Sequence, residues 1–411
     1  MPPQPHRTLA LAVIGLSLAL AYGIWYSYSV VLVALLDEFG WSRSVLAGAF
    51  SLFTLLHGGV NPLVGALCVR AGPLRVTAAG GAAIALALLA VSSIGTPLGL
   101  YLAFGVLTAL AVALAGWVPA LVHVQRHFQD RLGLSIGIIS AGVGVGMTLV
   151  VPLTQWLIDA AGWRNAYRVL GLVCFLWITP ASLWLMRRKG PAPAAQRRGA
   201  DDARPGAARA AGHAMTLRQA MRTQPFWLLI AAYFFGNVSS QTLHVHQVAY
   251  LVDHGVAALV AATVVGVVGL ASIFGKTGGG WLSDRIDREL VYMGGIAILA
   301  GAAFALLSIG ASPAPWQPYA YAVLLGLGYS VTAAITPAMV ADRFSGPHFG
   351  SIVGVGLMAN AAGSAFGPWL AGRLYDASGS YALAFTLSAA SGALAGCAAW
   401  RARALRRVAG R

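Results

Sequence analysis

The chain has 411 residues, of which 58% are hydrophobic and only 9% are charged, and its formal net charge is +15. A soluble domain carries about a quarter charged residues, so this composition excludes an ordinary soluble protein. The apolar stretches run past ~18 residues, the length at which a helix crosses a bilayer core, and they lack the two-residue alternation of a barrel. We therefore predict an all-α polytopic membrane protein. The three cysteines stand far apart in apolar surroundings and predict neither a disulfide framework nor a metal site.

Twelve apolar segments follow one another along the chain, and we interpret each as one transmembrane helix. Short breaks between them contain the residues that turns require, such as Gly40, Gly72–Pro73, Gly162 and Gly379. Several segments exceed the minimum length, which allows a helix to tilt. The predicted spans are residues 8–36, 44–69, 74–94, 97–125, 132–158, 164–186, 224–252, 256–283, 290–310, 316–341, 348–373 and 380–400.

The segment 187–222 differs in composition from its surroundings, because Arg, Ala, Pro and Gly dominate and aromatic residues are absent. Such a segment cannot bury a core and is predicted to be a solvated cytoplasmic linker. It divides the chain into an N-terminal six-helix bundle, residues 1–186, and a C-terminal six-helix bundle with a basic tail, residues 223–411. The end of the linker, residues 215–222, alternates apolar and basic residues and is predicted to lie along the membrane surface.

Basic residues are distributed unevenly over the two predicted sides of the membrane. If both termini are placed in the cytoplasm, 22 of the 27 Lys and Arg residues lie on the cytoplasmic side, four lie outside, and Lys276 lies within a span. Cytoplasmic loops carry such an excess, so we predict that both termini lie inside. The same bias accounts for the net charge, because cytoplasmic basic residues serve membrane insertion and attract anionic lipid. We therefore expect no nucleic-acid partner.

The two halves repeat each other weakly. Residues 65–70, with the pattern Gly-x-Leu-x-x-Arg, correspond to residues 280–285, with the pattern Gly-x-Leu-x-Asp-Arg. Repeated six-helix halves around a midplane site are an architecture of secondary transporters. No Gly-x-x-x-x-Gly-Lys-Ser phosphate loop occurs, so we do not expect ATP to drive the protein directly, and we expect no cofactor.

Residues 280–288 read Gly-Trp-Leu-Ser-Asp-Arg-Ile-Asp-Arg, which resembles the loop signature of the major facilitator superfamily, Gly-x-Leu-x-Asp-Arg-x-Gly-Arg. Asp287 replaces the second glycine, and Val69 stands where the first-half copy would carry its acid. In that family the acid and base of the loop lock the cytoplasmic ends of neighbouring helices. The resemblance implies the major facilitator fold and a complete lock in the second half alone. The residues to which we assign gating are Arg70, Asp284, Arg285, Arg288 and Asp342.

A closer resemblance is to the branch of this superfamily that holds monocarboxylate transporters and oxalate–formate antiporters. It covers nearly the whole chain and implies carriage of a small organic acid, although a fold does not determine a substrate. The matching segments are residues 39–43 (Phe-Gly-Trp-Ser-Arg), residues 133–167, His246-x-x-x-Tyr250-Leu251, Gly275-Lys276, Asp342-Arg343-Phe344 and Gly367-Pro368.

Lys276 is the strongest candidate for a substrate contact. A basic side chain at membrane depth costs a few kcal/mol to insert, so it indicates a function. It lies eight residues before Asp284, which is about 12 Å along a helix and places it near the middle of a ~30 Å core. No Asp or Glu lies in the middle of a span, so a substrate anion is the obvious partner. The branch that the chain resembles usually has arginine here, which binds the substrate carboxylate. A lysine that snorkels to an interface is the structural alternative.

Two histidines of the seventh span are the next candidates. His246 matches a histidine of the resembling branch and could carry a co-transported proton, because histidine titrates near neutral pH. His244 lies on a different helical face, and a structural, hydrogen-bonded imidazole stays open for both. The other candidates are polar side chains within spans, for which helix packing is the alternative: Asn61, which corresponds to Lys276 in the repeat, Asn360, Tyr26, Tyr28 and Tyr329.

These observations predict a secondary transporter that carries a small organic monocarboxylate by alternating access, in proton symport or in exchange for a counter-anion. A single intramembrane charge favours a monocarboxylate over a dicarboxylate. We expect a monomer in the plasma membrane of a bacterium. Two alternatives stay open, an exporter of a hydrophobic drug or metabolite and a transport-inactive membrane sensor. We do not expect an enzyme, since no nucleophile–base or metal constellation appears.

Overall fold

The computed structural model describes residues 5–128, 132–187, 215–344 and 348–409, and the regular structure in these ranges is helical throughout. The first half consists of α1 (Pro5–Phe39), α2 (Arg43–Ala71), α3 (Pro73–Val91), α4 (Pro97–Leu100), the π-helical segment η1 (Tyr101–Thr108), α5 (Ala109–Ala115), α6 (Trp117–His127) and α7 (Leu132–Arg187). The second half consists of α9 (Leu217–Ala220), α10 (Gln224–Asp253), α11 (Ala258–Ser283), α12 (Arg288–Leu307), α13 (Gln317–Ala341), α14 (Phe349–Ser378) and α15 (Ala382–Ala409).

Ten helices of the described chain are long and apolar enough to cross a membrane. One of them, α7, contains two spans, because Gly162 interrupts it with a φ of 80° and a non-helical backbone. Helix α10 is not among the ten although it has 30 residues. Polar side chains crowd its second part, between Asn237 and Gln247. With α7 counted twice and α10 added, the described helices form twelve spans, which confirms the predicted fold class.

Glycines separate the spans where the sequence predicts breaks. Gly40, Gly72 and Gly379 have φ values of 62°, 90° and 68°, a region that residues with a Cβ rarely adopt. Helices α1, α2 and α14 therefore end at these positions.

The predicted linker falls mostly on residues 188–214, which lie outside the described residues. At its end, the predicted surface segment 215–222 contains the single helical turn α9. Thr216 and Gln219 form a capping box there, in which each side chain bonds the backbone N–H of the other residue. This local motif explains why a turn of helix forms at the end of a low-complexity segment.

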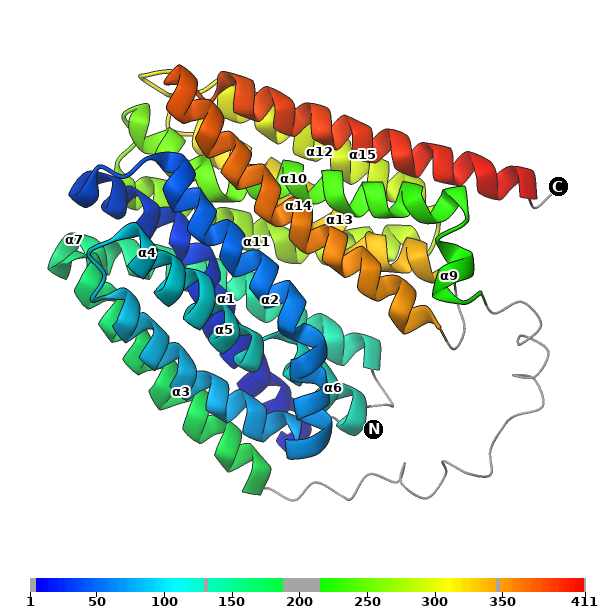
Figure 1. The fold of residues 1–411 in the computed structure, drawn as a ribbon, viewed down its shortest axis with the longest axis horizontal. Helices are drawn as coiled ribbons and strands as arrows, with labels where there is room; N and C mark the ends of the chain where they lie inside the picture. Colours follow the sequence, from blue (N-terminus) through cyan, green and yellow to red (C-terminus); the bar gives the residue numbers. More distant parts are fainter. Residues whose placement is uncertain (1–4, 129–131, 188–214, 345–347, 410–411) are drawn as a thin grey trace.

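The helices gather into two bundles that lie side by side (Figure 1). In the first bundle α7 packs along α1 and α3, and in the second α10 packs along α14 and α15. Two helix pairs join the bundles, α2 with α14 and α7 with α11, and α1 also meets α10. Each joining pair has one helix in each half, so a change in the tilt of one half against the other must repack these contacts.

The two ends of the molecule differ in how the halves meet. We call the end formed by residues 40–42, 254–257 and 379–381 the closed end. The other end, where α1 begins and α15 finishes, is the open end (Figure 1). At the closed end the two halves are in contact, and toward the open end a cavity separates them.

Replacing Gly144 by alanine is expected to destabilise the joint between α7 and α11. A Cβ at Gly144 would lie 2.6 Å from the Gly269 carbonyl oxygen and 2.6 Å from Ile273 Cγ1, so the two helices would have to separate. Overpacking of this kind costs about 1–3 kcal/mol. A thermal-unfolding experiment on the purified protein should show a lower midpoint for Gly144→Ala.

Gly137 on the same helix is the matched control, because a Cβ there meets nothing within 4 Å. Alanine is a better helix former than glycine, so Gly137→Ala should leave the midpoint equal or slightly higher. Equal midpoints for both variants would show that the α7–α11 approach is not tight.

Candidate functional site

A cavity of about 850 Å³ lies between the two halves. Its wall includes residues 54–62 of α2 and residues 350–364 of α14. Beyond these stretches, toward the closed end, the same two helices touch, and the Ser51 hydroxyl donates to the Ala365 carbonyl at 2.5 Å. The cavity therefore lies on the open-end side of this contact.

The first half contributes a largely aromatic wall. Tyr22, Trp25 and Tyr26 of α1 line the cavity together with His57 of α2 and Trp117 of α6. Trp25 stacks on Tyr22 with ring centroids 5.8 Å apart, and it meets His57 edge-on at 4.8 Å. Such rings combine apolar faces with polar tips, so this wall suits a ligand that has an apolar body.

The second half contributes a more polar wall. Asn237, Ser240 and Gln241 of α10 line the cavity with Thr332 of α13 and Ser364 of α14. The Ser364 hydroxyl donates to Asn237 Oδ1 at 3.4 Å. Gln241 Oε1 is buried without a hydrogen-bond partner in the described part of the chain. Part of the polar stretch that distinguishes α10 from the other spans therefore lines the cavity.

The structure brings five of the predicted substrate contacts to one place. Tyr26 and Asn61 of the first half and Tyr329 and Asn360 of the second half line the cavity. His244 lies against two of them, with its ring centroid 5.4 Å from that of Tyr26 and 4.6 Å from that of Tyr329. These five residues come from five helices, and their meeting makes the cavity the candidate site.

Tyr28 does not line the cavity. Its ring is buried and stacks on Phe104 at 4.2 Å, and its hydroxyl donates to the Leu46 carbonyl at 2.7 Å. The phenol therefore ties α1 to α2 inside the first half, which is the packing role that the sequence left open for it.

Lys276 is not among the residues that line the cavity either. It is half-buried and lies on the stripe of α11 that includes the buried Gly269 and Ser272, seven and four residues earlier. Neighbouring α13 packs against α11 through Gly275 and presents Tyr329 to the cavity. Within the described residues Lys276 makes no hydrogen bond or ion pair. It is thus a cation within a candidate membrane span, and no anion of the described residues neutralises it.

Arg43 joins the halves at the closed end. Its Nη2 donates to both carboxylate oxygens of Asp253, at 2.9 and 2.8 Å, and its Nη1 donates to the Tyr381 hydroxyl at 2.7 Å. The backbone N–H groups of Arg43 and Ser44 donate to the Asp376 carboxylate at 2.9 and 3.0 Å. Charge-assisted hydrogen bonds of this kind are strong. Among the residues that the structure describes, Arg43–Asp253 is the ion pair that connects the halves.

His246 extends this closed-end network rather than lining the cavity. Its Nε2 lies 2.8 Å from the Pro368 carbonyl, and its Nδ1 lies 2.9 Å from the Tyr381 hydroxyl. Because a carbonyl can only accept, Nε2 carries the hydrogen, and neutral His246 accepts at Nδ1. The Tyr381 hydroxyl accepts from Arg43 Nη1 and donates its own hydrogen to His246 Nδ1. The chain of hydrogen bonds runs from Arg43 through Tyr381 and His246 to α14.

The residues that we assigned to gating lie at the open end. Arg288 of α12 pairs with Asp342 of α13 at 2.5 Å and also donates to the Ala338 carbonyl. Arg285 is exposed and lies over the Trp281 ring at 3.5 Å. The remaining two, Asp284 and Arg70, are exposed at the ends of α11 and α2. These contacts stay inside the second half, so they do not close the open end.

A second charged cluster at the open end fastens α15 to the start of α12. Asp287, which stands where the family signature has glycine, pairs with Arg403 at 2.6 Å and with Arg406 at 2.8 Å. The buried Glu289 pairs with Arg406 at 3.1 Å and with Arg343 at 3.8 Å. Burial lowers the pKa of the Arg343 guanidinium, and the Glu289 carboxylate opposes that shift. Asp287, which departs from the signature, therefore helps to hold α15 against the start of α12 within the second half.

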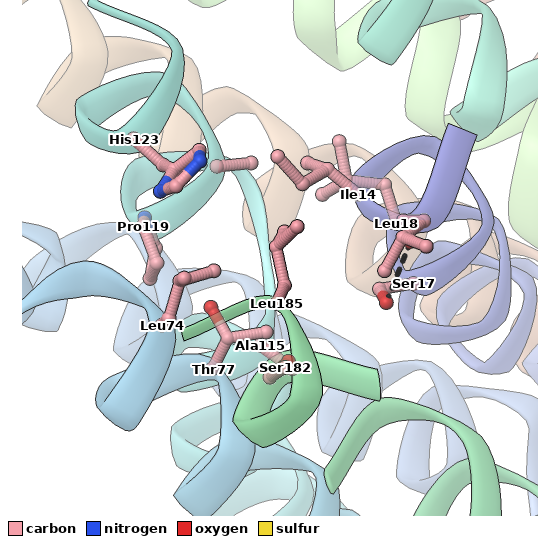
Figure 2. Close-up of a pocket in the computed structure, with 12 residues that line it drawn as sticks. Ile14, Ser17, Leu18, Leu74, Thr77, Ala115, Pro119, His123, Ser182 and Leu185 are labelled. Atoms are coloured by element: carbon pink, nitrogen blue, oxygen red, sulfur yellow. Dashed lines mark hydrogen bonds between the residues drawn. The ribbon is translucent and has the colours of Figure 1, made fainter. Parts of the chain in front are cut away.

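A smaller hollow lies within the first half, beside Ser17, Thr77, His123 and Ser182 (Figure 2). Its volume is about 10 Å³, near the lower limit for a single water molecule. It is too small for an organic substrate, so the cavity between the halves is the better candidate. Across the described residues no three His, Cys, Asp or Glu side chains gather as a metal site would require.

Comparison with known proteins identifies the family. The profile of the Major Facilitator Superfamily matches residues 14–317 and, in a second match, residues 253–409. Over 379 residues the chain is 30% identical to Monocarboxylate transporter 3 of Rattus norvegicus, which covers 92% of this chain and 75% of the rat protein. The chain belongs to the monocarboxylate transporter branch of the major facilitator superfamily. This confirms both resemblances drawn from the sequence motifs.

Other members of this branch match over a similar length. Monocarboxylate transporter 13 of Rattus norvegicus is 25% identical, over 90% of this chain and 83% of that protein. Monocarboxylate transporter 11 of Mus musculus is 28% identical, over 92% of this chain and 82% of that protein. The chain is accordingly a multi-pass membrane protein that transports small organic substrates.

Solved structures show the same fold. A bacterial homologue of the human lysosomal transporter Spinster, crystallised in an inward-facing and unoccupied conformation, superposes with a TM-score of 0.73 at 16% identity, over 97% of each chain. The inward-facing and occupied form of the same protein gives a TM-score of 0.70. The arrangement of two six-helix halves is therefore that of the superfamily.

Sequence reasoning did not assign a role to the closed-end residues. Arg43 belongs to the Phe-Gly-Trp-Ser-Arg pattern and is one of the four basic residues on the side that otherwise lacks them, which was the available signal. Its partners Asp253, Asp376 and Tyr381 follow it by 210 residues or more, so nothing local links them. Trp25 was also missed, because a tryptophan in an apolar span does not stand out.

Proposed function

We propose that this chain is a secondary transporter of a small organic monocarboxylate, which it carries by alternating access in proton symport or in exchange for another anion. The observation that carries the proposal is Lys276, a half-buried cation within a candidate membrane span that has no partner among the described residues. A charge at membrane depth is costly unless it is neutralised, and a bound carboxylate would neutralise it.

The Lys276 side chain must change its conformation to reach a ligand in the cavity. Lysine has a flexible four-carbon stem and a compact charge, so it can move between a resting position along α11 and the cavity. The adjacent wall, with Tyr329 and Thr332 of α13, offers hydroxyl groups that could share the carboxylate oxygens. The proposed site thus combines one cation with neutral donors, which suits a single carboxylate.

Alternating access would tilt residues 1–186 against residues 223–411 around the cavity. In the arrangement described here the cavity lies toward the open end, while Arg43, Asp253 and Asp376 join the halves at the closed end. Opening the closed end requires the loss of these contacts. We place the open end and both termini in the cytoplasm, because the distribution of basic residues favours that orientation. In this proposal the protein acts as a monomer in a bacterial plasma membrane.

Proton coupling would act through His246. A proton added at Nδ1 would turn that atom from an acceptor into a donor, and the Tyr381 hydroxyl could no longer donate to it. It would also place a second positive charge near Arg43. The neighbouring Asp376 carboxylate partly offsets that charge, and Asp253 pairs with Arg43. His254 lies eight residues further along the chain, at the C-terminal cap of α10. Protonation should therefore weaken the closed-end network and favour its opening.

Replacing His246 by glutamine is expected to flatten the pH dependence of uptake. A glutamine amide can donate to the Pro368 carbonyl and accept from Tyr381, so it imitates neutral histidine without titrating. Initial uptake rates in proteoliposomes between pH 5 and 8, where histidine changes charge, would measure the effect.

His254 is the matched control for this experiment. It lies at the same end, is only partly buried, and bonds the Tyr250 carbonyl of its own helix at 2.7 Å. The variant His254→Gln should keep the parental pH profile. If His246→Gln also keeps that profile, the proton does not act at His246 and anion exchange becomes the better mechanism.

The aromatic first-half wall favours one alternative, an exporter of a hydrophobic compound. Tyr22, Trp25 and Trp117 would suit such a cargo without any charge. The two functions differ in their need for Lys276, because an exporter of neutral compounds would continue to work without it.

A further inference from the structure

We propose that Trp25 and His57 form a subsite for the ring end of an aromatic monocarboxylate that carries a hydroxyl group opposite its carboxylate. This inference rests on the proposed function, because it takes an organic carboxylate as the substrate. It adds the chemical class of the rest of the molecule and two residues that the sequence did not assign to it.

Trp25 is held in place by other rings. Besides Tyr22 and His57, it meets Phe53 edge-on with centroids 4.8 Å apart and Phe50 edge-on at 6.1 Å. His57 in turn stacks on Phe53 with an interplanar angle of 14°. Edge-to-face and stacked contacts stabilise aromatic clusters and restrict their rotation. Both rings are therefore packed against the rest of the aromatic wall before a ligand arrives.

The two polar tips lack partners. Trp25 Nε1 and His57 Nε2 are both buried and make no hydrogen bond to any residue that the structure describes. An indole N–H can only donate, and a buried polar atom without a partner costs about 1–3 kcal/mol. Both residues line the cavity while the two nitrogen atoms themselves are covered, so a small rotation of the rings on binding would let a ligand in the cavity supply the missing partner.

A hydroxyl group meets the needs of both atoms. It can accept from the Trp25 Nε1–H and donate to His57 Nε2, which is a lone pair in one neutral tautomer. The two ring centroids lie 4.8 Å apart, so both residues belong to the same part of the cavity wall. A methyl group of the same size would leave both atoms unpaired.

The space between this subsite and the second half suits a flat ring. Tyr26 lies beside Trp25, with centroids 6.3 Å apart, and reaches across to His244 and Tyr329. A ring that bridges Trp25 and the second half would stack among these side chains. The cavity of about 850 Å³ is also much larger than a three-carbon acid requires.

The test compares three carboxylates by thermal shift on the purified full-length chain: 4-hydroxybenzoate, 4-methylbenzoate and lactate. A ligand that binds the folded state raises the apparent midpoint in proportion to its affinity and concentration. The parental protein should bind 4-hydroxybenzoate about tenfold more tightly than 4-methylbenzoate, the effect of pairing buried polar atoms. Lactate should bind more weakly than either aromatic acid.

The variant Trp25→Phe keeps a ring but removes the N–H. It should abolish the preference for 4-hydroxybenzoate and leave the affinity for 4-methylbenzoate within about twofold. Trp177→Phe is the matched control, because Trp177 is also half-buried with an unpartnered buried Nε1 among the described residues but does not line the cavity. This control should keep the preference.

The outcomes separate this inference from the proposed function. If the aromatic acids bind equally well, or if Trp25→Phe and Trp177→Phe behave alike, the subsite is wrong and carboxylate transport still stands. If only lactate binds, the aromatic class is wrong and carboxylate transport still stands. If no carboxylate shifts the midpoint, both proposals fail.

Discussion

Replacing Lys276 by alanine is expected to reduce carboxylate uptake at least about thirtyfold, while expression and folding remain intact. Removing one partner of a desolvated charge pair costs about 2–5 kcal/mol, and each 1.4 kcal/mol is a factor of ten. The folded protein itself should tolerate the change, because Lys276 makes no ion pair or hydrogen bond with the described residues. Initial rates of uptake of a labelled carboxylate into proteoliposomes would measure the loss, and the gel-filtration profile would report folding.

Two variants make the result specific. Lys276→Arg keeps the positive charge and should retain substantial uptake, since the related branch tolerates arginine at this position. Arg75→Ala removes an exposed basic residue at the start of α3, away from the cavity, and should transport normally. Unchanged uptake by Lys276→Ala would overturn the assignment and favour the exporter of hydrophobic compounds.

Replacing Arg43 by glutamine is expected to open the closed end. The Arg43 side chain is 10% exposed and that of Asp253 is 34% exposed, so solvent partly screens the pair. We therefore discount the cost of a fully buried pair to roughly 1–3 kcal/mol, which shifts the balance between closed and open forms by about 5- to 150-fold. The lost hydrogen bond to Tyr381 also frees the hydroxyl that contacts His246.

The opening can be measured with a cysteine in the cavity wall. Ser240→Cys would be placed in a background without the three free cysteines Cys68, Cys174 and Cys397. A membrane-impermeant maleimide added outside intact cells should label it slowly in the parental protein and faster after Arg43→Gln. The measurement also tests the proposed orientation, because rapid labelling of the parental protein from outside would place the open end there.

Arg168 supplies the control for charge at the closed end. It is exposed, and among the described residues it bonds only within the first half, to Ser92 at 3.1 Å and to Asn165 at 3.1 Å. Arg168→Gln should leave the labelling rate unchanged, whereas Arg43→Lys should give an intermediate rate because lysine lacks the bidentate fork. Equal labelling of Arg43→Gln and the parental protein would show that other contacts keep the closed end shut.

Gating residues illustrate how far motif reasoning reached. The loop signature led to Arg288 and the Asp-Arg-Phe match led to Asp342, and the structure pairs these two at 2.5 Å. It did not reveal that their contact joins α12 to α13 inside one half. Which partner a charged side chain meets depends on the distance between helix ends, and a pattern of residues within one loop contains no such distance.

The sequence by itself determined the twelve spans, the glycines between them and the unusual depth of Lys276. These features follow from the thickness of the hydrocarbon core, which sets a length for every span, and from backbone conformations that favour glycine. Each is a local property, so it can be recognised from neighbouring residues alone.

Only the tertiary structure decided which side chains share a site. It placed Tyr26, Asn61, Tyr329 and Asn360 around one cavity and moved His246 from the expected substrate contacts into a network with Tyr381. The physical reason is that a polar residue in a span can face a cavity, another helix or its own backbone, and the local sequence does not distinguish these surroundings. The packing of distant helices selects among these, because every buried polar group must find a partner wherever the fold provides one.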